Sequence, residues 1–513
     1  MNPRIRVDWR ASVSLTGSVV KWLTVPMLFP VALATYYGRG IEAFLVTVPL
    51  ALVVGWTLEQ LHDDPGQALG AREGFLMVAL TWLLVSLVGA VPYLAEGWLT
   101  AYGSASTLKW PVNALFETMS GFTTTGSTVM RSITFEHHSR ALMMWRQETQ
   151  WLGGMGIVVL AIAILPELSV GGAQLMDAEA PGPGIEKLTP RIAETARTLW
   201  GLYIGLTAIE ILGLYVFHRV GIAPEMTAYN AVAHGFTTMP TGGFSPEARS
   251  IEAFSAVVQW FIVPFMVAAG TNFALFWHLW NRELGTVIED VEFGSYLGIM
   301  GVLSALVAGL LFTAPGSDAL TGALEPSVRH AVFQIASIVT TTGYASMDFN
   351  LWGENTKYVL LFAMFVGGSA GSTGGSIKVI RWVVIVKSLF RELFTTIHPE
   401  AVQPVRLGSK AIDEQTIRGV YAFTLLYLVI FAVATLLVVV LGHTTDPLSA
   451  FEATSAVAAT LGNVGPGIGV AGPMANFEGF PAVSKLLMVF LMWIGRLEIF
   501  PVLVLLTQAY WRS

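Results

Sequence analysis

Four stretches of threonine and glycine recur along this chain of 513 residues and could bind a cation. They read TTTGST, PTGGFS, TTTGYA and TLGNVGPG, at residues 123–128, 240–245, 340–345 and 460–467. Rings of backbone carbonyls can replace the hydration shell of a potassium ion, and threonine hydroxyls add neutral oxygens. Glycine permits the left-handed backbone that aims successive carbonyls the same way. These residue types predict coordination of a dehydrated alkali cation.

The spacing of the four stretches indicates an internal repeat. Gly126, Gly243 and Gly343 are 117 and 100 residues apart, and each follows a short apolar segment. In the fourth stretch either residues 460–463 or residues 463–465 could occupy the equivalent position. We favour the first, with Gly462 as the fourth glycine, because Phe451 precedes it by 11 residues and Phe116 precedes Gly126 by 10. Such a repeat predicts the architecture more strongly than any single motif.

The elements that hold these stretches must lie in a membrane. The chain is 54% hydrophobic and 12% charged, with a mean hydropathy of +0.63, whereas soluble proteins carry about 25% charged residues. This composition excludes a soluble enzyme and a nucleic-acid binder. The absence of cysteine excludes disulfides and thiolate metal sites.

Segments of about 20 apolar residues can cross a bilayer, and ten candidates occur. They are 13–36, 41–58, 74–94, 141–165, 198–217, 253–277, 295–314, 357–385, 419–441 and 483–507. The first is expected to stay as a membrane helix and not to be cleaved as a signal peptide. Lysine and arginine gather before the first span and after the fourth and eighth, which places both chain ends in the cytoplasm by the positive-inside rule.

The resulting fold class is an all-α polytopic membrane protein. Four repeats of span, pore helix, filter loop and span surround one pore, and two extra transmembrane helices precede them. The expected boundaries are 1–70 for the two leading helices, then 71–190, 191–290, 291–400 and 401–513 for the repeats.

The eighth span is interrupted at residues 367–376 by five glycines. Each glycine costs a helix about 1 kcal/mol relative to alanine, so this stretch is expected to be unwound inside the membrane. The alternative is a cluster of small residues that packs against a neighbouring helix. The glycines are Gly367, Gly368, Gly371, Gly374 and Gly375.

Two basic residues are candidates for a functional role: Lys378 closely follows the glycine stretch at 367–376, and Arg496 lies in the last expected span. Arg496 falls near the middle of the tenth span, where a charge is costly and marks a functional site by default. It either faces the cavity beneath the filter or locks helices through a pair with Glu498 or Glu210. Lys378 is either a second positive charge, beside Arg496, that controls passage of ions through the pore (a gate charge) or a lysine whose amine reaches the membrane surface.

The four-repeat plan and the four strings resemble the Trk/Ktr/HKT superfamily of potassium transporters, most closely its bacterial TrkH/TrkG branch. Further matching motifs are EAPGP at 179–183, EKLTPR at 186–191, the glycine run at 367–378 and GRLE at 495–498. The resemblance covers nearly the whole chain.

The resemblance implies a residue-level site. Ion-coordinating backbone is expected at Thr124, Thr125, Gly126, Thr241, Gly242, Gly243, Thr341, Thr342, Gly343, Leu461, Gly462 and Asn463. The segment 367–378 is expected to be an intramembrane gate loop, with Lys378 and Arg496 as gate residues. In plant relatives a serine at the first filter glycine accompanies sodium selectivity, so Gly126 favours potassium.

The resemblance also implies a setting. The transported ion is potassium, the location is the bacterial cytoplasmic membrane, and the expected partners are a second copy of the chain and a cytosolic ring of nucleotide-binding subunits of the TrkA/KtrA type. The alternative function is a sodium-selective or sodium-coupled porter of the same fold. An intramembrane enzyme is not expected, because the spans contain no paired aspartates, Ser–His pair or histidine cluster. Channel-like and ion-coupled transport both remain open.

Overall fold

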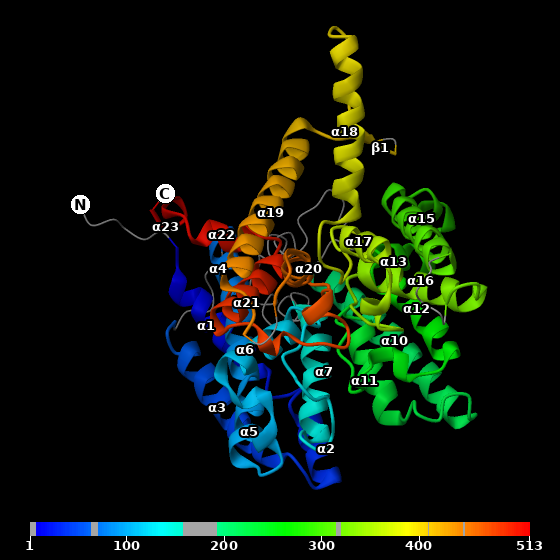
Figure 1. The fold of residues 1–513 in the computed structure, drawn as a ribbon. Helices are drawn as coiled ribbons and strands as arrows, with labels where there is room; N and C mark the ends of the chain where they lie inside the picture. The colour runs from blue at the N-terminus through cyan, green and yellow to red at the C-terminus, as the bar shows by residue number, and fades with distance from the viewer. Residues whose placement is uncertain are drawn as a thin grey trace.

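The computed structural model describes residues 7–62, 70–156, 192–313, 320–408, 410–444 and 447–512, and nearly all of their regular structure is helical (Figure 1). The extended exception within these ranges is a two-residue antiparallel ribbon of β1 (Arg406–Leu407) and β2 (Lys410–Ala411). The motifs at 179–183 and 186–191 and the end of the fourth expected span lie outside the described residues.

Three helices lead the chain: α1 (Trp9–Trp22), α2 (Leu28–Tyr37) and α3 (Ile41–Glu59). The first expected span is therefore two helices joined by a turn. Helices α1 and α3 approach closely where Gly17 faces Gly55. The approach is so close that a Cβ on either glycine would collide with the backbone of the other helix. Small residues permit such close helix packing in membranes.

In the expected division into four repeats, the first repeat contains α4 (Ala71–Gly89), α5 (Val91–Leu99), α6 (Pro111–Phe122) and α7 (Arg140–Gly154), with the short turns η1 (Gly103–Ala105) and η2 (Thr107–Lys109). The second contains α10 (Ile192–Arg219), α11 (Ala228–Thr238), η4 (Ser250–Ala253), α12 (Ala256–Ala269), α13 (Phe273–Trp280) and α14 (Leu284–Ile288).

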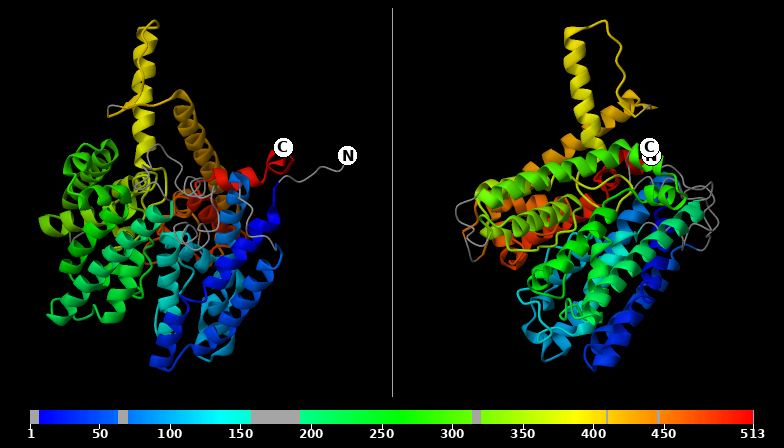
Figure 2. Two further views of the ribbon diagram at one scale, coloured as in Figure 1. Left: turned by 180° about the vertical axis from the view of Figure 1, so that it is seen from behind. Right: turned by 90° about the vertical axis from the view of Figure 1, so that its right-hand side faces the viewer.

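The third repeat contains α15 (Val291–Thr313), α16 (Leu324–Val339), η5 (Phe349–Leu351), α17 (Glu354–Ala363) and α18 (Val379–Ile397). The fourth contains α19 (Glu414–Leu441), α20 (Ala450–Leu461), η6 (Gly469–Ala471), η7 (Phe477–Gly479), α21 (Ala482–Arg496), α22 (Phe500–Leu505) and α23 (Gln508–Arg512). Figure 2 shows α18 projecting well beyond the rest of the helices.

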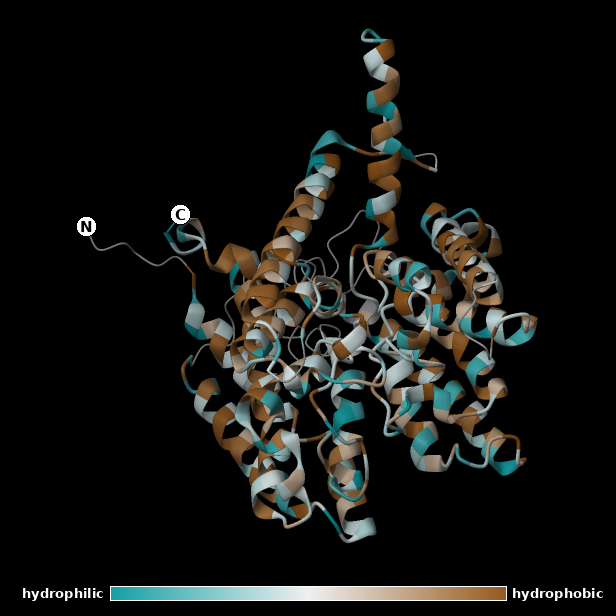
Figure 3. Cartoon of the chain, in the orientation of Figure 1, coloured by the Kyte–Doolittle hydropathy of each residue, from teal (hydrophilic) through white to brown (hydrophobic). Residues whose placement is uncertain are grey.

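Among the described residues, five uninterrupted segments are long and apolar enough to cross a membrane: Ile41–Glu59, Arg72–Leu99, Ala196–Arg219, Val291–Thr313 and Glu414–Leu441. Their outward faces expose large apolar side chains, and Figure 3 shows hydrophobic colour along α3, α15 and α19. The expectation of an all-helical membrane protein with several apolar spans is met.

Two further spans that the sequence predicted as continuous are also broken. The span at 253–277 divides into α12 and α13, which are bent by 98°. The bend falls at Gly270–Asn272, and the Asn272 side chain starts α13 by accepting from the Ala274 backbone nitrogen at 3.0 Å. The span at 483–507 breaks after Arg496, where Glu498 and Ile499 adopt positive φ values of 57° and 63°. Hydropathy averaged over a whole span does not detect these breaks, because most residues on either side of each break are apolar.

The two described ends of the chain meet. Val7, Leu76 and Tyr510 form one buried apolar cluster, and the Tyr510 hydroxyl donates to the Arg72 carbonyl at 2.6 Å. Both ends therefore lie at the same end of the molecule, as an even number of crossings requires.

Candidate functional site

The four threonine- and glycine-rich loops share one unusual backbone conformation. Directly after α6, α11, α16 and α20, a non-glycine residue has a positive φ: Thr124 (52°), Thr241 (55°), Thr341 (59°) and Asn463 (53°). Two residues later comes a glycine with positive φ: Gly126 (84°), Gly243 (75°), Gly343 (81°) and Gly465 (107°). Left-handed backbone on a non-glycine residue costs about 1–3 kcal/mol and is concentrated at functional sites.

This geometry corrects the register of the fourth loop. Gly462, which the sequence analysis placed opposite Gly126, has an ordinary right-handed φ of −79° and ends α20. Asn463 matches Thr124, and Gly465 matches Gly126. The distance from the phenylalanine to the glycine predicted the wrong register, because Phe451 and Phe116 are not equivalent residues. Phe451 is the second residue of α20, whereas Phe116 is the sixth of α6.

Counting from the helix starts gives the same correction. Pro111 precedes Thr124 by 13 residues, and Ala450 precedes Asn463 by 13. In the fourth loop, the residues equivalent to Thr124, Thr125 and Gly126 are therefore Asn463, Val464 and Gly465. Leu461 and Gly462 are no longer expected among the coordinating residues.

The four loops contact one another in closed order. A Cβ on Gly126 would collide with the Gly242 carbonyl of loop 2, and one on Gly243 with the Thr342 carbonyl of loop 3. In the same way Gly343 faces the Val464 carbonyl of loop 4, and Gly465 faces the Thr125 carbonyl of loop 1. We call the carbonyls of Thr125, Gly242, Thr342 and Val464 the ring carbonyls. Glycine is required at the facing positions because a side chain would displace a ring carbonyl.

Buried side-chain hydroxyls form hydrogen bonds within and between the loops. The Thr125 hydroxyl lies 2.7 Å from that of Thr123 and accepts from the Asn463 amide at 2.9 Å, which links loops 1 and 4. The Thr340 and Thr342 hydroxyls pair at 2.7 Å in loop 3. All five side chains are buried.

One mouth of the ring opens into a vestibule with an empty volume of about 490 Å³, which includes its open side. Gly126, Gly243, Gly343 and Gly465 all line it. Glycines from all four loops therefore meet around a single opening.

A buried ion pair stands at this vestibule. Arg146 of α7 contacts Glu117 of α6 at 2.7 Å, and both are almost fully buried. Glu117 also accepts from the Thr128 hydroxyl at 2.8 Å and the Val129 nitrogen at 2.9 Å. Glu117 therefore ties α6 to the outgoing part of loop 1. Local sequence patterns do not predict this pair, because its members are 29 residues apart.

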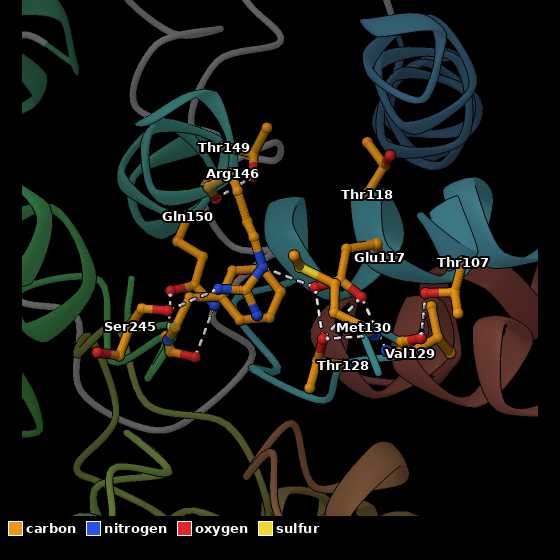
Figure 4. A network of polar contacts seen from close by, with 12 residues as sticks. Thr107, Glu117, Thr118, Thr128, Val129, Met130, Arg146, Thr149, Gln150 and Ser245 are labelled. Atoms are coloured by element: carbon orange, nitrogen blue, oxygen red, sulfur yellow. Dashed lines mark hydrogen bonds and ion pairs between the residues drawn. The ribbon is translucent and has the colours of Figure 1, made fainter. Parts of the chain in front are cut away.

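On its other side, Arg146 contacts loop 2 (Figure 4). It donates to the Ser245 carbonyl at 3.1 Å, and its guanidinium lies 3.5 Å from the centre of the Phe244 ring. One basic side chain thus joins the first two loops.

The glycine-rich segment 367–378 has no helix, as expected, and lies against loops 3 and 4. The Gly375 nitrogen donates to the Thr341 hydroxyl at 2.6 Å. A Cβ on Gly374 would lie 3.1 Å from the Thr340 carbonyl, and one on Gly375 would lie 2.5 Å from the Gly462 carbonyl. The glycines therefore allow this segment to lie directly on loops 3 and 4.

The break between α12 and α13 holds the same segment. The Ser369 nitrogen donates to the Gly270 carbonyl at 2.8 Å, and the Phe273 nitrogen donates to the Gly371 carbonyl at 3.1 Å. The Thr373 hydroxyl donates to the Ala269 carbonyl at 3.1 Å. Ending a helix frees backbone groups, and here those groups bind the glycine-rich segment.

Arg496 also contacts this segment. Its guanidinium donates to the Thr373 carbonyl at 2.7 Å and to the Gly153 and Gly154 carbonyls at 3.0 Å. Glu498, one of the two partners considered for it, pairs instead with Arg381 at 2.6 Å. Arg496 therefore joins the glycine-rich segment to the end of α7.

Lys378 and Glu292 complete the contacts of the segment. The Lys378 amine is buried and donates to the Gly374 carbonyl, so it does not reach a membrane surface. Glu292, which the sequence analysis missed, accepts from the Ala370 nitrogen at 2.7 Å and the Ile380 nitrogen at 3.2 Å. Glu292 thereby fixes the segment near both of its ends.

Comparisons with known proteins give the family. The model of the TrkH family, described as cation transport protein, matches residues 41–513. The Trk system potassium uptake protein TrkH of Escherichia coli (strain K12) is 37% identical over 511 residues, which cover 99% of this chain and 100% of that protein. The corresponding TrkG of the same organism is 33% identical over 98% of this chain and 99% of its own.

A solved structure agrees in fold. The crystal structure of the potassium transporter TrkH from Vibrio parahaemolyticus aligns with a TM-score of 0.83 and 32% identity, over 99% of this chain and 100% of that one. These matches confirm the resemblance found in the sequence and the expectation of a transport protein and not an enzyme. The chain belongs to the TrkH family of cation transport proteins.

Proposed function

We propose that this protein carries potassium into the bacterial cell across the cytoplasmic membrane, through a selectivity filter formed by its four loops. The observation that carries the proposal is the closed ring of left-handed loops, in which each ring carbonyl lies against the glycine of its neighbour. The names of the relatives, potassium uptake proteins, agree with it.

The ion ligands of the proposed filter are backbone and hydroxyl oxygens. They belong to three consecutive residues in each loop: Thr124, Thr125 and Gly126; Thr241, Gly242 and Gly243; Thr341, Thr342 and Gly343; Asn463, Val464 and Gly465. Each loop follows the C-terminal end of a pore helix, which carries roughly −0.5 charge and favours a cation. Four equivalent repeats, with the boundaries given above, surround the pore.

The segment 367–378 is the proposed gate. Its contacts with Thr341, Gly270 and Arg496 hold it against loops 3 and 4, so an ion leaving the filter meets it. Opening requires the segment to leave these contacts. Arg496 and Lys378 add positive charge there, which raises the barrier to a cation while the gate is closed.

Partner proteins are proposed to control the opening of this gate. We propose a homodimer whose cytosolic face binds a ring of nucleotide-binding subunits. In support, α18 projects from the body and exposes Phe390, Leu393 and Ile397, apolar surface of the kind that a protein partner covers. Lys387 and Arg391 on the same helix support a cytoplasmic location for it by the positive-inside rule.

Flux through the purified protein in liposomes tests the function. With imposed gradients of K⁺, Rb⁺, Na⁺ or Li⁺, we expect rapid uptake of K⁺ and Rb⁺ and slow uptake of Na⁺ and Li⁺. Uptake of Na⁺ as fast as K⁺, or K⁺ uptake that requires Na⁺, would replace the proposal with the sodium-selective or sodium-coupled porter. No flux of any cation would reject both.

A further inference from the structure

Loop 2 differs from the other three at its ring-carbonyl position. Loops 1, 3 and 4 carry side chains there, from Thr125, Thr342 and Val464, whereas loop 2 has Gly242. The space is not empty. A Cβ on Gly242 would collide with the side-chain amide of Gln150, which belongs to α7 of the preceding repeat.

Gln150 makes two hydrogen bonds to loop 2. Its Nε2 donates to the Gly242 carbonyl at 2.6 Å, and its Oε1 accepts from the Phe244 nitrogen at 3.1 Å. The side chain is completely buried. The orientation of the amide follows from its partners, because only its nitrogen can donate and only its oxygen can accept.

Arg146 lies one helical turn before Gln150 and faces the same loop. Figure 4 shows the two side chains together, with Arg146 between Glu117 and the residues of loop 2. Residues four apart lie on one face of a helix, so α7 holds Gly242, Phe244 and Ser245 from one side.

We propose that Gln150 is a selectivity-determining residue that positions the Gly242 ring carbonyl. The proposal rests on the function assigned above to the four loops. A carbonyl oxygen has two lone pairs, so the Gly242 oxygen can accept from Gln150 and still face an ion. Loops 1 and 3 are supported by their own threonine hydroxyls, whereas loop 2 takes this support from Gln150.

The absence of a side chain at Gly242 makes this external support necessary. Glycine is the most flexible residue of the backbone, and Gly242 is followed by a second glycine. Without the amide, the Gly242 carbonyl loses its side-chain donor, and its peptide keeps the longer hydrogen bond of 3.3 Å from the Gly243 nitrogen to the Thr237 carbonyl. The position of this ring carbonyl is then less firmly fixed. The ring of carbonyls can then contract around a smaller ion such as Na⁺ or Li⁺, which lowers the selectivity for K⁺.

Two variants of nearly equal size test the proposal. Gln150→Met keeps the length of the side chain but removes both hydrogen bonds, and Gln150→Leu removes them with a shorter, branched side chain. We expect each to lower the K⁺/Na⁺ and K⁺/Li⁺ flux ratios in liposomes by roughly threefold or more, the scale of one lost neutral hydrogen bond. Thermal unfolding on the same preparations establishes that the variants are folded.

Gln147 provides a matched control. It lies on α7, is fully buried, and its amide atoms have no hydrogen-bond partner among the described residues. Gln147→Leu should leave the flux ratios unchanged. Equal changes in Gln147→Leu and Gln150→Leu, or an unchanged ratio in folded Gln150→Met, would overturn the role of Gln150. A wild-type protein without K⁺ selectivity would instead overturn the proposed filter itself.

Discussion

At the scale of single residues, the four loops of the proposed filter carry backbone strain at matching positions. Thr124, Thr241 and Thr341 are β-branched and adopt a left-handed backbone that such residues avoid. The contacts between loops keep them there, because every ring carbonyl lies against the glycine of the preceding loop in the ring. Strain held by neighbouring loops in this way is a form of pre-organisation.

Gly126→Ser tests this pre-organisation. Gly126 has a φ of 84°, and any side chain there meets the Gly242 carbonyl. We expect the variant to fold but to discriminate less against Na⁺ and Li⁺, measured as flux ratios in liposomes. Gly38→Ser is the control, since Gly38 has a φ of 65° but a Cβ there meets nothing within 4 Å. Unchanged ratios in Gly126→Ser would remove Gly126 from the filter.

The Glu117–Arg146 pair permits a second test at this scale. Glu117→Gln leaves the buried guanidinium beside the vestibule without its charge partner, and breaking a buried pair costs about 3–5 kcal/mol. We expect a lower midpoint of thermal unfolding and slower K⁺ uptake.

Glu478→Gln is the matched control for that variant. Glu478 pairs with Arg131, whose side chain is 71% exposed, and such surface pairs contribute about 0–1 kcal/mol. Equal stability losses in the two variants would contradict the structural role of the buried pair.

At the scale of elements, the short helices before each loop and the unwound glycine-rich segment could be predicted from the sequence. Apolar spacing and glycine density are local signals. The register of loop 4 and the break after Ala269 were not predictable in the same way. The first depends on where α20 begins, and the second depends on contacts with residues about 100 positions later, such as Ser369 and Gly371.

Deleting residues 371–374 tests the gate as an element. The deletion removes the Gly371 carbonyl bound by Phe273, the Thr373 carbonyl bound by Arg496 and the Gly374 carbonyl bound by Lys378. Since the ring carbonyls are left in place, we expect faster basal K⁺ flux with unchanged K⁺/Na⁺ selectivity. A folded protein that conducts less would show that the segment supports the pore and does not obstruct it.

At the scale of the whole molecule, residues from the second, third and fourth proposed repeats hold the glycine-rich segment, and Arg496 links it to the first. Met239 and Ala269 of the second repeat accept from the Thr373 hydroxyl, and Thr341 and Glu292 of the third accept from its backbone. Arg496 of the fourth repeat binds its Thr373 carbonyl and also the end of α7 in the first. Sequence patterns predict each participant separately, but they do not predict that these groups converge.

Arg496→Ala decides whether this convergence serves gating or scaffolding. Its guanidinium is solvated by three carbonyls, and Glu498 is paired with Arg381, so removing Arg496 leaves that carboxylate paired. Loss of hydrogen bonds from a charged donor costs about 1.5–3 kcal/mol, which lowers stability without preventing folding. Removing the charge also removes a barrier, since two unit charges about 6 Å apart repel by roughly 3 kcal/mol at an effective dielectric constant near 20.

We therefore expect the Arg496→Ala protein to be folded, somewhat less stable and several-fold faster in K⁺ or Rb⁺ flux. Arg496→Lys keeps the positive charge but cannot reach three carbonyls with a planar fork, so it should loosen the gate with a smaller gain in flux. Measuring flux and thermal unfolding on the same preparations separates the two roles. A fall in both quantities for Arg496→Ala would assign this residue to the scaffold, because loss of a gate charge alone cannot slow a cation.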